Sequence, residues 1–74
     1  MGSATAEIDS LKTEMALVLG KLEEELTRGN REAVRHHLQT FEILAGELED
    51  LAGNHYAAPS IVSIAWRFLE TGRR

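Results

Sequence analysis

The chain contains no cysteine among its 74 residues. This excludes disulfides, thiolate zinc sites and a thiol nucleophile, and it fits a reducing compartment, so we expect a cytoplasmic protein. No apolar run approaches the roughly 20 residues that cross a bilayer, and no basic and apolar leader opens the chain. We therefore expect neither a membrane contact nor secretion.

Basic residues are also scarce, because 8 Lys and Arg stand against 12 Asp and Glu and the net charge is -4. Only Arg73 and Arg74 cluster. A chain of this charge without a basic patch repels a phosphate backbone, which disfavours nucleic-acid binding. Since no glycine-rich phosphate loop or nucleophile elbow occurs either, we expect no cofactor and no small-molecule substrate.

Apolar residues recur at helical spacing in two long segments, about residues 5–28 and 31–52. In the first segment they occupy an arc of roughly 100°, the width of a face that packs on a core, and the second segment carries a matching stripe. Ser3 or Thr5 is expected to cap the first helix, and Gly53 to end the second. Between them Gly29 supplies a left-handed residue and Asn30 a cap, and so short a turn predicts an antiparallel αα-hairpin. The predicted stripes are Ile8, Leu11, Met15, Val18, Leu19, Leu22 and Leu26, then Val34, Leu38, Phe41, Leu44, Ala45, Leu48 and Ala52, with His37 and Leu51 at the margin.

A third helix is expected over about residues 59–71, because Pro59 suits a first helical turn and Gly72 a helix end. Its apolar arc is about 200° wide, which is more than one hairpin groove covers. The helix either packs in its own hairpin with part of this arc exposed, or is shared with another chain. We predict a single all-α domain over residues 1–74, with residues 1–4 disordered or left from expression and 72–74 a tail.

Two apolar residues fall outside the stripes. Leu17 and Ile43 lie on the backs of the two helices, and each is followed after three residues by a glycine, Gly20 and Gly46. A glycine allows a close approach that a Cβ would block, so these pairs indicate a second contact surface. The alternative is that both glycines are tolerated on a solvated face.

A chain of this size, without disulfides, has barely enough core to be stable alone, so we expect association. A homodimer that completes a helical bundle and a heterodimer with a larger partner both remain open. Large aromatic residues often anchor such contacts. The residues predicted at the interface are Leu17, Gly20, Ile43, Gly46, Val62, Trp66 and Leu69.

An enzyme is the less favoured interpretation. Glu32 and His36 are four residues apart and share a helix face, a possible pair of metal ligands, with His37 beside them. That face is otherwise polar and offers no third or fourth ligand, so we predict a solvated surface and no metal. His37 is expected at the edge of the core.

The stretch EMALVLGKLEEELTRGN and the helix after it resemble the small helical-hairpin co-chaperones of type III secretion needle subunits, over about residues 7–52. The resemblance implies a partner chaperone that grips the hairpin, with Leu17 and Ile43 as contacts. It does not extend to the helix that carries Trp66. The sequence thus favours a non-enzymatic protein-binding module, an adaptor, chaperone or antagonist, over a purely structural homo-oligomer.

Overall fold

The protein is a bundle of three helices, described over residues 3–71 by a computed structural model, with side chains from residue 5 onward. The helices are α1 (Ser3–Arg28), α2 (Arg31–Ala52) and α3 (Ser60–Thr71), and the described residues contain no strand. The molecule measures 50 × 19 × 16 Å. The predicted all-α hairpin with a third helix is therefore confirmed, and none of the three described helices has the length and apolarity to cross a bilayer.

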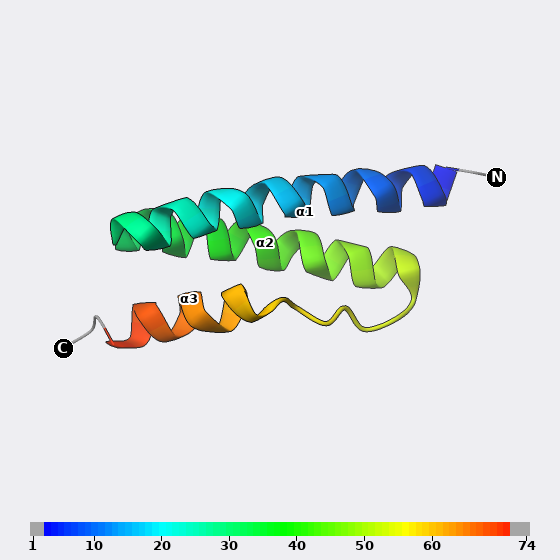
Figure 1. Cartoon of the computed structure of the whole chain (residues 1–74). Helices are drawn as coiled ribbons and strands as arrows, with labels where there is room; N and C mark the ends of the chain where they lie inside the picture. Colours follow the sequence, from blue (N-terminus) through cyan, green and yellow to red (C-terminus); the bar gives the residue numbers. More distant parts are fainter. Residues whose placement is uncertain (1–2, 72–74) are drawn as a thin grey trace.

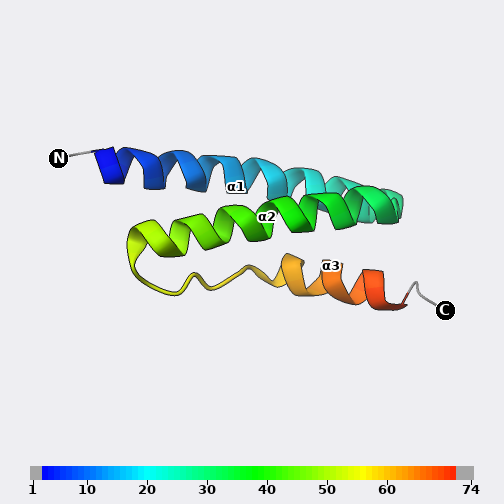
Figure 2. The ribbon, with the colours of Figure 1, turned by 180° about the vertical axis from the view of Figure 1, so that it is seen from behind.

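The chain folds back twice along the long axis. Helices α1 and α2 lie antiparallel, and the linker from α2 then returns along the hairpin so that α3 runs in the same direction as α1 (Figures 1 and 2). The rod therefore has an open end, where α1 starts and α2 finishes, and a turn end at residues 29–30. Helix α3 lies toward the turn end, while the linker occupies the open end.

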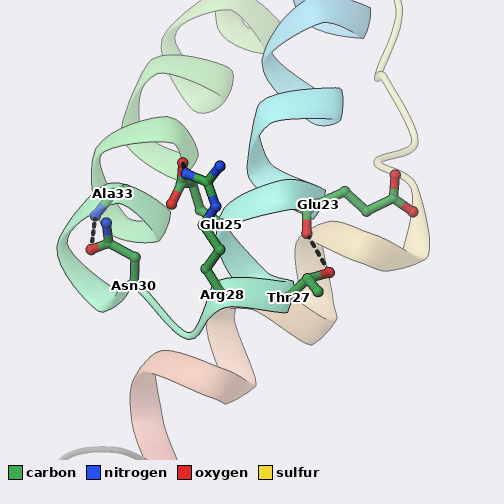
Figure 3. Close-up of polar contacts among 6 residues, drawn as sticks. All are labelled: Glu23, Glu25, Thr27, Arg28, Asn30 and Ala33. Atoms are coloured by element: carbon green, nitrogen blue, oxygen red, sulfur yellow. Dashed lines mark hydrogen bonds and ion pairs between the residues drawn. The ribbon is translucent and has the colours of Figure 1, made fainter.

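The turn between α1 and α2 has the predicted chemistry. Gly29 has φ 75° and donates its N–H to the Leu26 carbonyl at 3.1 Å. The side-chain oxygen of Asn30 accepts from the N–H of Ala33 at 3.3 Å, which satisfies a first-turn amide of α2 (Figure 3). At the other end of α2, Gly53 has φ 76° and donates to the Glu49 carbonyl at 2.8 Å.

The helix starts differ slightly from the expected ones. Helix α1 begins at Ser3, so the prediction of disorder is wrong for residues 3 and 4, and Thr5 lies inside the helix instead of capping it. Pro59 directly precedes α3 and its carbonyl accepts from the Val62 N–H at 3.1 Å. The predicted remnant at residues 1 and 2, the Gly72 stop and the tail 72–74 lie outside the described residues.

The predicted stripes form one core together with one face of α3; their remaining residues are mostly half-buried and pack against it. The exceptions are Leu51 and Ala52, which are exposed, because the core side of α2 ends at Leu48. Helix α3 packs on its own hairpin, the first of the two alternatives raised by its wide apolar arc. The core consists of Leu11, Met15, Leu22, Val34, Leu38, Phe41, Leu48, Val62, Ala65 and Leu69.

Two charged side chains of α2 form hydrogen bonds with the backbone of α3 and of the linker. Arg31 donates from Nη1 to the carbonyls of Phe68 and Leu69, at 3.4 and 3.1 Å, and so binds groups that the last turn of α3 leaves unpaired. Glu49 accepts the Tyr56 N–H at 2.9 Å through Oε2. The Tyr56 ring in turn lies 6.1 Å from that of Phe41.

Candidate protein-binding face

The hairpin has a face that α3 and the linker leave uncovered. Two hollows run along it, each lined by residues of both α1 and α2 and by none from residues 53–71. Val18 lies level with Leu44 in one hollow, and Leu11 with Leu51 in the other. We call this surface the open face. The residues that line its two hollows are Glu7, Ser10, Leu11, Glu14, Leu17, Val18, Lys21, Thr40, Leu44, Glu47, Asp50 and Leu51. Ile43 lines neither hollow, but helical spacing places it beside Thr40, Glu47 and Asp50, and we include it in the open face.

Large apolar side chains on the open face are solvent-exposed. The exposed fractions are 62% for Leu17, 65% for Ile43 and 40% for Leu51. Burying one such side chain fully contributes about 1.5–3 kcal/mol, so a partner that covered all three would gain a substantial part of the free energy of a micromolar complex. One exposed leucine is ordinary on a protein surface, whereas several on the same uncovered face indicate a contact site.

The two helical glycines make no close contact within the chain. A Cβ built on Gly20 or on Gly46 would meet no atom within 4 Å. The hollow beside Gly20 is lined by residues of α1 alone, Glu23, Glu24 and Thr27. Helix α3 therefore does not pack against these glycines, and a close contact with another chain stays a prediction.

The structure separates the other predicted interface residues. Val62 and Leu69 are buried in the core, with 8% and 7% exposure, because α3 docks on its own hairpin. This corrects their assignment to a surface that meets a partner. Trp66 is 38% exposed, but it lines a different hollow, with Arg31 and Arg35 of α2.

His36 and His37 are not arranged as a catalytic or metal-binding site. Glu32 and His36 are both exposed, and His37 is half-buried, as expected at the edge of the core. The rings of His36 and His37 lie 5.6 Å apart and tilted. Within the described part of the chain, no group of three or more His, Asp or Glu side chains is arranged to hold a metal ion.

Charge on the open face follows a pattern that the sequence analysis missed. Glu7, Glu14, Lys21 and Arg28 recur at intervals of seven residues along α1. Seven residues are close to two helical turns, so the four side chains follow one another along α1 with a drift of about 20° per step. Glu7, Glu14 and Lys21 line the two hollows, and Arg28 continues the column at the turn end. The signal was present in the sequence as a change of sign at the middle of α1, next to Leu17.

A comparison with protein-family models, with curated proteins and with solved structures finds no match to this chain. The resemblance to needle-subunit co-chaperones therefore stays a prediction. The assignment of a function rests on the geometry of the open face.

Proposed function

We propose that this chain is a non-enzymatic protein-binding module of the cytoplasm, and that the open face of the hairpin is its binding surface. The observation that carries the proposal is the exposure of Leu17, Ile43 and Leu51 on a face that no other part of the described chain covers. The absence of cysteine fits the reducing compartment.

The shape of the face favours a helical ligand. A groove between two antiparallel helices accepts the apolar side of a third helix, in the way that α3 already occupies the other side of this hairpin. The glutamates at the rim and Lys21 would then set the orientation of the ligand, because charged groups at a rim contribute specificity more than affinity. An adaptor, a chaperone or an antagonist would use such a surface.

The test is affinity capture from an extract of the source cells, with bound proteins quantified by mass spectrometry. The double variant Leu17→Glu with Ile43→Glu places two charges on the open face and is expected to lose the captured proteins. Ile64→Glu is the matched control, since Ile64 is 55% exposed but belongs to α3. Circular dichroism checks that both variants stay helical.

Two outcomes would contradict the proposal. The first is that the Leu17 and Ile43 variant captures the same proteins in the same amounts as the unchanged chain. The second is that only the Ile64 variant loses them, which would move the binding surface to α3.

A further inference from the structure

We infer that the open face binds a second copy of this chain, with α1 antiparallel to α1 and α2 antiparallel to α2. The inference rests on the proposed function and names the partner of the same surface. It follows from the order of charges along the face, from the position of its exposed apolar residues and from its area.

The charged column of α1 is complementary to itself when reversed. Its midpoint falls between Leu17 and Val18, with two glutamates before it and Lys21 and Arg28 after it. A two-fold axis at that midpoint sets Glu14 opposite Lys21 of the second copy, and Glu7 opposite Arg28. Symmetry repeats both pairs, so four opposite-charge pairs flank an apolar centre.

Helix α2 fits the same axis. The hollow that holds Val18 also holds Thr40 and Leu44, so the middle of α1 is level with residues 40–44 of α2. The axis therefore passes close to Ile43, and each copy would cover the exposed Ile43 of the other. Asp50 and His36 lie seven residues to either side of Ile43, which sets them opposite each other across the interface.

The other face-to-face arrangement is electrostatically unfavourable. A two-fold axis along the rod would place open end on open end, with α1 of one copy over α2 of the other. At the open end, the described residues of the open face include four carboxylates and no cation, so like charges would meet across the interface. These carboxylates are Glu7, Glu14, Glu47 and Asp50. Glu49 and Lys12 lie on the side of the linker instead.

Arg28 is free to join this arrangement although it already has a partner. Its Nη1 lies 3.3 Å from Glu25 Oε2, and 68% of the Arg28 side chain is exposed. A guanidinium has five N–H donors and binds two carboxylates at once.

The size of the face agrees with a stable dimer. The molecule is 50 Å long and 19 Å wide. A contact along most of such a face buries about 700 Å² on each copy, within the range of specific interfaces. The bundle so formed would have four central helices, with the two α3 helices on its outer sides.

The first experiment measures association by sedimentation equilibrium of the full chain and of charge variants. Glu7→Lys with Glu14→Lys makes the column entirely basic, and Lys21→Glu with Arg28→Glu makes it entirely acidic. Each variant alone is expected to raise the dissociation constant about 30-fold or more, because four attractive pairs become repulsive. An equimolar mixture of the two is expected to restore dimers. The matched control, Glu23→Lys with Glu42→Lys, changes the same charge at exposed positions outside the open face and is expected to leave association unchanged.

The second experiment fixes the orientation, since the chain has no cysteine of its own to interfere. Leu17→Cys lies beside the axis and is expected to form a disulfide with its copy under mild oxidation. Ser10→Cys lies on the same face, but its copy would be about 20 Å away along the helix, so no disulfide is expected.

The inference fails if the unchanged chain is still a monomer at about 100 μM, which is 100-fold above a micromolar dissociation constant. It also fails if the mixture of the two charge variants does not associate, or if Ser10→Cys forms the cross-link as readily as Leu17→Cys. A monomer whose captured proteins are lost with Leu17→Glu and Ile43→Glu would leave the proposed function intact and assign the open face to another protein. Captured proteins that do not respond to that variant would contradict the proposed function itself.

Discussion

Replacing Gly20 and Gly46 by alanine is expected to stabilise the protein. Both glycines lie inside helices, and an added Cβ would meet no atom within 4 Å. Alanine is favoured over glycine in a helix interior by about 1 kcal/mol. Because the two sites lie in different helices and share no neighbour, the double variant should gain about 2 kcal/mol, which raises the melting temperature by roughly 10 °C in a domain of this size.

The assay is urea unfolding followed by far-UV circular dichroism, at one fixed protein concentration because association also contributes to stability. The matched control is Gly53→Ala, whose φ of 76° places an alanine in the left-handed region. That variant should lose about 1 kcal/mol, since L residues are disfavoured there. A loss of stability on replacing Gly20 or Gly46 would refute this reasoning. A loss of self-association would show instead that the glycines pack closely against a second copy, as the sequence had indicated.

Two further predictions concern the polar contacts of α2. Arg31→Met is expected to lower the free energy of unfolding by about 1–2 kcal/mol, because it removes the guanidinium that donates to the Phe68 and Leu69 carbonyls. The control is Arg35→Met, since Arg35 is an exposed neighbour with no such bond. Equal effects of the two variants in urea unfolding would contradict the role of Arg31. Asn30→Ala should lower the free energy of unfolding by about 1 kcal/mol, because it leaves the Ala33 N–H without its cap. Thermal melts test this, with Asn54→Ala as the control. An unchanged melting temperature for Asn30→Ala would show that the cap contributes nothing.

The features of the fold that depend on neighbouring residues were predictable from the sequence. Gly29, Asn30 and Gly53 act through their own backbone or through an amide a few residues away, so their residue types and order were sufficient. The hairpin followed from two helical stripes joined by a short turn. The helix was predicted to start at about residue 5, with Ser3 or Thr5 as its cap, and the structure places the start two residues earlier, at Ser3.

The contacts of α3 could not be predicted from the sequence, because they join residues far apart in the chain. Arg31 lies 37 and 38 positions from the two carbonyls that it binds, and no local pattern reports such a pair. The same limitation explains Val62 and Leu69. Helical spacing showed that their face is apolar, but it did not show whether the covering surface belonged to this chain or to another.

For the candidate site, the sequence identified Leu17 and Ile43 as residues outside the core. The structure shows both side chains exposed, and Leu17 lines one hollow of the open face. Leu51 was missed as an exposed residue because it lies at the margin of a stripe, where helical angle alone does not separate buried from exposed positions. The charged column of α1 was visible in the sequence but had no meaning until the uncovered side of the hairpin was known.

The short α3 also orders the events of folding. Its 12 residues are too few for an isolated helix to persist in water, so it forms only on a surface that already exists. The hairpin supplies that surface, and its own contacts need only the closure of a short turn, which is fast. We therefore expect the hairpin to assemble first and α3 to dock last. In such an intermediate both sides of the hairpin would be free, and a second copy that bound at this stage would meet two apolar grooves instead of one.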